Sequence, residues 1–166
     1  PMSYLKLLLG FLLCCVTLFV APVSALAASS AAIRAYDDVA AVVKNYAGQN
    51  LVRSEFGDSN LEGANFDSAD LRGAVFNGAK LVNANWHGVD FSDGIAYITD
   101  FANADLTDPI LNSAMLLKSS FKNATITGAD FSDAAIDRAQ VIALCKTASG
   151  TNPVTGVDTR ESLGCR

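Results

Sequence analysis

Residues 61–91 read LEGANFDSADLRGAVFNGAKLVNANWHGVDF, and a large apolar residue recurs in this stretch at every fifth position. The same spacing extends from Leu51 to Val141, with Ala96 as the one small residue in the column. Beyond the first 27 residues, every phenylalanine of the chain falls in this column. Self-similarity at a fixed spacing predicts a repeat architecture.

The positions around the large residue predict the shape of one repeat. A small residue, usually Ala, stands two positions earlier, and a polar residue, most often Asn or Asp, lies between them. Residues two apart in an extended chain point to the same side, so the small and large residues face inward. The next two positions must turn the chain, and the second is mostly Gly, Asn or Asp. This predicts an all-β solenoid of very short strands joined by corners.

The pattern resembles the pentapeptide-repeat proteins, and it covers 49–143 without a break in register. The resemblance implies a right-handed quadrilateral β-helix, with four repeats in each coil and short α-helical caps at its ends. Stacked residues are then 20 positions apart, and about 4.8 Å per coil gives a rod about 23 Å long. Large rings and smaller side chains alternate within a coil, and we expect Trp86 to belong to this packed core.

Residues 1–27 have the features of a signal peptide. Lys6 precedes the apolar run Leu7–Ala21, and small residues follow, with cleavage motifs ending at Ala25 and Ala27. We choose cleavage after Ala27, which leaves no stable membrane anchor on the mature chain. A retained transmembrane helix is the alternative, but a span needs about 20 apolar residues and this run is shorter.

Both ends of a solenoid expose the apolar interior, so each end needs a covering segment. Residues 28–48 carry apolar positions at helical spacing and predict a capping helix that ends at Gly48. Residues 144–166 predict a helical cap at the other end. Its first helix lies within Ile136–Ala148, where repeat and helical spacing overlap, and a second spans Thr159–Leu163.

Two cysteines, Cys145 and Cys165, remain after the signal peptide. In an exported protein we expect this pair to form a disulfide, with two free buried thiols as the alternative. The segment between them looks like the end of lumenal pentapeptide-repeat proteins from cyanobacteria and chloroplasts, in which the tail is closed by a disulfide. The resemblance implies a protein of the thylakoid lumen, or of the periplasm in a cyanobacterium, and brings no enzymatic activity with it.

Residues that carry chemistry are few, and we expect neither an enzyme nor a cofactor. His87 is the only histidine and has no second ligand at metal-binding spacing. The outward Asp70, Asp90 and Asp130 form a ladder on one side, with Asp93 and Asp133 at the adjacent corner. Such carboxylates could share a divalent cation, although a solvated acidic surface is the simpler interpretation.

We predict a structural, protein-interaction rod with an unidentified protein partner, and the oligomeric state stays open. The formal net charge of −5 disfavours binding to nucleic acid. Two alternatives are a DNA mimic that interacts with gyrase, as some pentapeptide-repeat proteins do, and a cation- or small-ligand-binding lumenal protein. The export signal and scattered basic residues oppose the first, and the second needs a cleft with convergent polar groups.

The repeat departs from its own pattern near Gly94–Ile98, where Ala96 replaces the large core residue. Apolar residues also occupy outward positions here and one coil away, and a contiguous apolar strip predicts an interface. Two arrangements without an interface also stay open: a flanking helix or the C-terminal tail covers the strip, or Ile95 or Ile98 turns inward to fill the gap. The predicted strip consists of Val75, Ile95, Tyr97, Ile98, Ile110, Met115 and Leu117.

Overall fold

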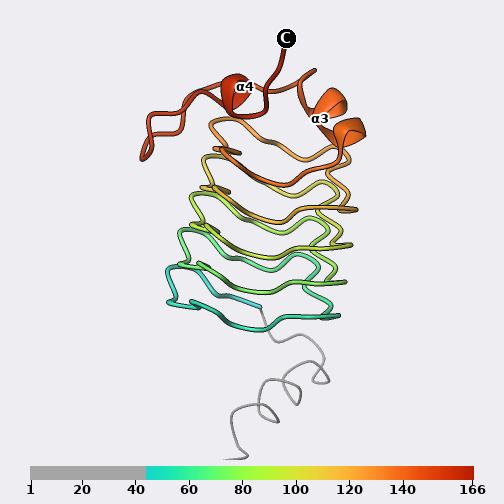
Figure 1. Ribbon diagram of the computed structural model, residues 1–166. Helices are drawn as coiled ribbons and strands as arrows, with labels where there is room; N and C mark the ends of the chain where they lie inside the picture. Colours follow the sequence, from blue (N-terminus) through green and yellow to red (C-terminus); the bar gives the residue numbers. More distant parts are fainter. Residues whose placement is uncertain (1–43) are drawn as a thin grey trace, which may run out of the picture. The chain divides into compact units, whose positions relative to one another are not determined.

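The computed structural model describes residues 44–166, which form a stack of coils followed by two short helices (Figure 1). Each outward residue forms a parallel β-bridge with the residue 20 positions later, from Asn45 with Asn65 to Met115 with Ala135. An offset of 20 residues and a repeat of five residues give four repeats in each coil, as the sequence predicts. No helix in this part of the chain has the length and apolar character needed to cross a membrane.

Backbone hydrogen bonds join successive coils at the sides and at the corners. At one side, the Leu71 N–H donates to the Asp90 carbonyl (2.8 Å), and the Asp90 N–H donates to the Ala69 carbonyl (3.2 Å). Within a coil, the N–H of a small residue closes each turn on the carbonyl three positions earlier, as from Ala74 to Leu71 (2.9 Å). Strands of one bridged residue can therefore satisfy the buried backbone without a long ladder.

The second corner residue of the repeat adopts a left-handed backbone conformation. All positive-φ, non-glycine residues in the described part lie at this position, with φ between 55° and 60°. Asn and Asp account for most of them, because their short polar side chains tolerate this conformation. Ile98 (φ 56°) is the β-branched exception among them, and such a backbone costs on the order of 1–3 kcal/mol.

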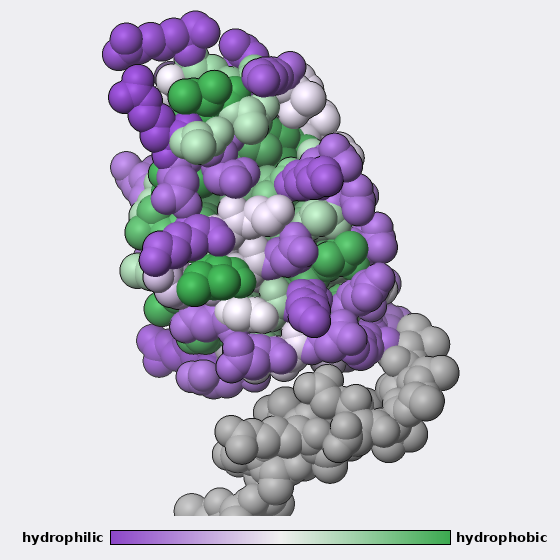
Figure 2. All heavy atoms as spheres, turned by 90° about the vertical axis from the view of Figure 1, so that its right-hand side faces the viewer, coloured by the Kyte–Doolittle hydropathy of each residue, from purple (hydrophilic) through white to green (hydrophobic). Residues whose placement is uncertain are grey.

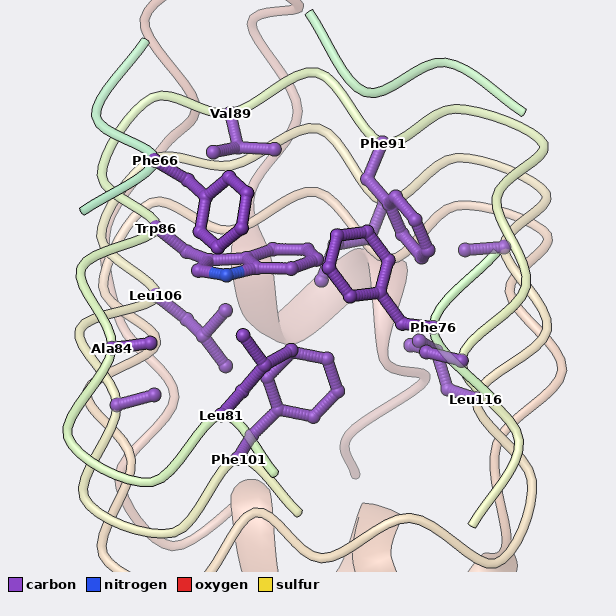
Figure 3. Packing of buried hydrophobic residues seen from close by; sticks show 14 of the residues in the cluster. Phe66, Phe76, Leu81, Ala84, Trp86, Val89, Phe91, Phe101, Leu106 and Leu116 are labelled. Carbon is purple, nitrogen blue, oxygen red and sulfur yellow. The ribbon is translucent and has the colours of Figure 1, made fainter. Parts of the chain in front are cut away.

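The large residues of the repeat fill the interior of the coils. Phe66, Trp86 and Leu106 enter from one side, Phe76 and Leu116 from the opposite side, and all point inward (Figure 3). Rings that are 20 residues apart stack: the ring centroids of Phe56 and Phe76 lie 4.6 Å apart, and those of Phe101 and Phe121 lie 5.3 Å apart. The predicted inward column is the core of the protein.

Trp86 marks the point at which the aromatic residues change sides. Before it, rings lie on two opposite sides of the coils, whereas Phe91 and Phe101 lie on the other two sides. The fully buried indole contacts Phe76 at 5.1 Å, Phe91 at 5.2 Å and Phe101 at 5.1 Å between ring centroids. Ala96 is also fully buried, since these rings fill the space in which a larger side chain would lie.

The repeat begins earlier than the sequence indicates. Asn45 bridges to Asn65, and the Tyr46 ring stacks on Phe66 at 4.7 Å. Residues 44–48 therefore belong to the first coil, and their assignment to the capping helix 28–48 is corrected. The signal peptide predicted for 1–27 and the remainder of that helix lie outside the described residues.

The repeat also ends earlier than the predicted boundary at residue 143. The last bridged residue is Ala135, and helix α3 (Arg138–Leu144) follows. It is shorter than the helix predicted within Ile136–Ala148. Over these residues apolar side chains suit both spacings, so packing at the end of the stack decides where the repeat stops.

A short tail follows α3 at the C-terminal end of the coils (Figure 1). Helix α4 (Thr159–Ser162) begins at Asp158, whose side chain accepts hydrogen bonds from the N–H groups of Arg160 and Glu161. Cys145 and Cys165 are joined by a disulfide with an S–S distance of 1.97 Å. Three apolar side chains of the tail lie in the same buried cluster as the coils: Leu144, Ala148 and Leu163.

Candidate interaction surface

The outward residues of the coils form four ladders, one on each side. Three ladders are mainly polar: Asn45, Asn65, Asn85, Asp105 and Thr125; Asn50, Asp70, Asp90, Ile110 and Asp130; and Asn60, Lys80, Asp100 and Ser120. The fourth begins at Glu55 and continues with four apolar residues, which we call the apolar ladder: Val75, Ile95, Met115 and Ala135.

The apolar ladder is flanked by apolar residues at only one of its two corners. Tyr97, Ile98 and Leu117 follow it along the chain, whereas the preceding corner carries Asp93 and Asp133. We call the apolar ladder together with Tyr97, Ile98 and Leu117 the apolar face. Apolar side chains reach the surface of the coils in patches between polar ones (Figure 2).

Several residues of the apolar face are open to solvent. The exposed fraction is 54% for Ile98 and 41% for Met115, while Val75 and Ile95 are half-buried. Ile95 keeps its outward place in the ladder between Val75 and Met115. The inward turn considered for Ile95 or Ile98 is therefore not observed, and the C-terminal tail leaves Ile98 and Met115 exposed.

Ile110 does not join the other predicted strip residues. It lies in a neighbouring ladder, between Asp90 and Asp130. Its predicted inclusion in one continuous strip is therefore corrected. A corner with polar residues separates the two ladders, so Ile110 is an isolated apolar residue on an acidic side.

The corner beside the apolar ladder is held by polar contacts. The Tyr97 N–H donates to Asn77 Oδ1 (3.1 Å), and the Lys118 N–H donates to Asp137 Oδ2. Lys118 Nζ lies 5.2 Å from the centre of the Tyr97 ring. A hydrogen bond with the Tyr97 side chain raises the pKa of Lys118 above its usual value. Tyr97 therefore presents one ring face to a cation that stays charged.

The acidic ladder has its carboxylates engaged by nearby side chains and turns. Asp70 accepts hydrogen bonds from Arg72 Nε (2.8 Å) and Nη2 (2.7 Å), which lower the pKa of this carboxyl. Asp90 accepts from the N–H and hydroxyl of Ser92, and Asp130 from those of Ser132. Within residues 44–166 no group of three His, Cys, Asp or Glu side chains could hold a metal ion.

His87 lies on the surface, as predicted for an outward position. Its Nδ1 is 2.8 Å from Asp67 Oδ1, one coil earlier. The Asn85 side chain, beside it, donates through Nδ2 to Asn65 Oδ1 (3.0 Å). These contacts between stacked residues link neighbouring coils, which accounts for His87 without a ligand.

Sequence reasoning missed three residues behind the apolar face. Thr99 and Ser119 replace the usual inward Ala and are buried. The Thr99 N–H donates to Ser119 Oγ (2.9 Å), and the Thr99 hydroxyl donates to the Phe76 carbonyl (2.8 Å). A Cβ on the third residue, Gly94, would lie only 2.3 Å from Cε2 of Phe91. Their departure from the alanine column was the available signal.

Comparison with known proteins agrees with the repeat seen in the coils. The sequence model for pentapeptide repeats matches residues 47–78, 69–108 and 99–138, with eight copies. The chain is 74% identical over 42 residues to thylakoid lumenal protein TL20.3 of Arabidopsis thaliana, and 50% identical over 46 residues to thylakoid lumenal 15 kDa protein 1 of the same plant. These matches cover 25% and 28% of this chain, but only 15% and 20% of the two relatives.

A solved structure gives a longer match. A pentapeptide repeat protein from the Arabidopsis thaliana thylakoid lumen is 36% identical to this chain, with a TM-score of 0.30. The match covers 73% of this chain and 91% of that protein. Location in the thylakoid lumen, which the sequence predicts, is thus shared by both curated relatives and by the solved protein.

Proposed function

This chain belongs to the pentapeptide-repeat family and is a protein of the thylakoid lumen, and from this premise we propose that it acts by binding a partner protein, without catalysis. The apolar face is the proposed binding surface. The observation that carries the proposal is the contrast between one apolar ladder and three mainly polar ladders on the same coils. A contiguous apolar patch with polar surroundings is typical of protein interaction sites.

The coils support this surface rigidly. In the proposal, they form the right-handed quadrilateral β-helix of the family, with hydrogen bonds between coils at the sides and corners. Fully buried rings lie directly behind the apolar face, among them Phe76 and Trp86. A preorganised surface loses little conformational entropy on binding, which favours association.

Ile98 supports the same proposal from its backbone. Its left-handed conformation is unfavourable for a β-branched residue, and its side chain is more than half exposed. Gly, Asn or Asp at this corner would relieve the strain. A residue that weakens the free protein and points to solvent is explained if its side chain contacts a partner.

We do not propose the two alternative functions. A DNA mimic needs an acidic surface around the coils, whereas one side here is apolar and Arg72, Lys80 and Lys118 lie among the acids. A cation site needs free carboxylates, but those of Asp70, Asp90 and Asp130 accept hydrogen bonds from their own turns.

Crosslinking in thylakoid lumen extract tests the proposed function. The mature protein should capture a partner, and Tyr97→Lys with Leu117→Glu should abolish capture, because charges then lie on the apolar face. The matched control is His87→Lys with Thr107→Glu, which introduces the same residues at the same repeat position on the opposite side. Equal capture by all three proteins, with equal melting temperatures, would exclude the apolar face as the binding surface.

A further inference from the structure

We propose that the partner of the apolar face is a second copy of this chain, bound face to face and antiparallel, with the two-fold axis between Ile95 and Met115. The inference rests on the proposed function, because it names the partner of the same surface. Three features of the described residues carry it: the order of residues along the ladder, the difference between its two corners, and a pair of unpaired opposite charges.

The order of residues along the ladder is self-complementary in the antiparallel arrangement. The axis lies at the centre of the four apolar residues, so that Ile95 faces Met115 of the second copy. The larger Val75 then faces the small Ala135. Glu55, the charged end of the same ladder, lies outside the overlap. In a parallel dimer two Glu55 carboxylates would face each other, which is unfavourable.

The two corners of the apolar face favour the antiparallel arrangement over the parallel one. An axis that crosses the face from corner to corner places each corner against the same corner of the second copy. Tyr97 then faces Leu117, and Asp93 faces Ser113. A parallel dimer would instead place Asp93 against Tyr97 and Ser113 against Leu117, with an apolar group facing a polar one each time.

Charge complementarity closes the end of the interface at the polar corner. The Arg53 side chain extends along this corner toward the next coil, where its Cγ lies 3.3 Å from the position of a Cβ on Gly73. In the antiparallel dimer, Asp133 of the second copy lies opposite this coil. Neither Arg53 nor Asp133 forms an ion pair within residues 44–166. The two-fold axis makes this contact twice.

The area of the face predicts a weak dimer. Four overlapping coils extend about 19 Å at about 4.8 Å each, and a side with its corners is about 20 Å wide, which gives about 400 Å² per copy. Stable interfaces bury about 800 Å² per partner. We therefore expect a dimer that forms in the micromolar range or above and dissociates on dilution.

Sedimentation of the mature protein over a range of concentrations tests the inference. We expect a reversible monomer–dimer equilibrium, which Tyr97→Lys with Leu117→Glu abolishes and His87→Lys with Thr107→Glu leaves unchanged. Arg53→Asp or Asp133→Arg alone should weaken the dimer about 10-fold, since each replaces two attractive contacts by repulsive ones. The double variant Arg53→Asp with Asp133→Arg should restore wild-type affinity, because the pair is then reversed.

Mixing the two single charge variants provides a sharper measurement. An equal mixture of Arg53→Asp and Asp133→Arg chains should form a heterodimer, because both of its contacts are attractive. Failure of both the double variant and the mixture to restore binding would overturn the antiparallel register. Melting temperatures of all variants, measured at low concentration, should stay within a few degrees of wild type, which separates lost association from lost folding.

Two further outcomes would overturn the second copy as the partner. A protein that stays monomeric at every concentration, yet loses its lumenal crosslink in the Tyr97→Lys, Leu117→Glu variant, refutes the inference and leaves the proposed function standing. A monomer that dimerises only after removal of residues 28–43 would assign the apolar face to that segment of the same chain. Loss of neither association nor crosslink in the variant would refute both proposals.

Discussion

Gly94→Ala gives a test in which the repeat pattern and the three-dimensional structure predict opposite results. Alanine is the usual residue at this position of the repeat, and Gly94 does not have a positive φ. The pattern alone therefore predicts that Gly94→Ala stabilises the protein by about 0.4–1 kcal/mol, because the unfolded chain loses entropy. The contacts around Gly94 predict a loss of stability instead.

The expected loss follows from the position of the Phe91 ring. A Cβ on Gly94 would lie 2.3 Å from Cε2, 2.4 Å from Cζ and 2.5 Å from Cδ2 of Phe91. The ring cannot move aside freely, because it is fully buried and packed between Phe76 and Trp86. Overpacking of this kind costs about 1–3 kcal/mol, which exceeds the entropic gain.

Urea unfolding of wild type and variants measures the difference. The control is Gly57→Ala, where the nearest atom to the new Cβ is a backbone oxygen at 3.6 Å, so this change should be neutral or stabilising. Phe91→Leu should rescue Gly94→Ala, since Leu71 and Leu111 occupy the same side one coil away. Equal stabilisation by both glycine substitutions, or strictly additive effects in the double variant, would refute the reasoning.

Two further predictions concern the tail and the acidic ladder. Reduction of the Cys145–Cys165 disulfide, which spans 20 residues, should loosen 146–166 in hydrogen exchange while amides in the middle coils stay protected by their bonds to neighbouring coils; uniform loss of protection would show that the tail is essential to the coils. Arg72 lowers the pKa of Asp70 through a side-chain hydrogen bond, so this contribution to stability is present above the unfolded-state pKa of about 3.9 and is lost as the pH falls through the lower folded-state pKa. The melting temperature of wild type should therefore exceed that of Asp70→Asn at neutral pH and equal it in strong acid, and a difference that persists there would argue against the ion pair.

Much of the fold is determined locally, and for this reason the sequence predicted it. Inward and outward positions follow from the alternation of side chains in a short extended segment. Corners follow from residues that tolerate a left-handed backbone. These constraints act within five residues, so the column that contains Phe66, Trp86 and Phe101 was identified as core without a structure. The stacking of Ile95 between Val75 and Met115 followed from the offset of 20.

The boundaries of the repeat were not determined in this way. Tyr46 suits the apolar stripe of a helix as well as the core column, and residues 136–143 suit both spacings. What decides between them is whether a neighbouring coil supplies backbone partners. Asn45 finds such a partner in Asn65, whereas the last bridged residue is Ala135.

The sequence by itself determined which residues enter the core, and only the tertiary structure decided how they share its volume. The Ala96 position looked like a gap when each repeat was considered alone. In the structure the Trp86 indole and the Phe91 ring extend across the interior from other sides, and Gly94 makes room for one of them. The direction of a ring depends on all four sides of a coil and on the coils above and below. A pattern of single positions does not contain that information, because close packing is a property of the whole layer.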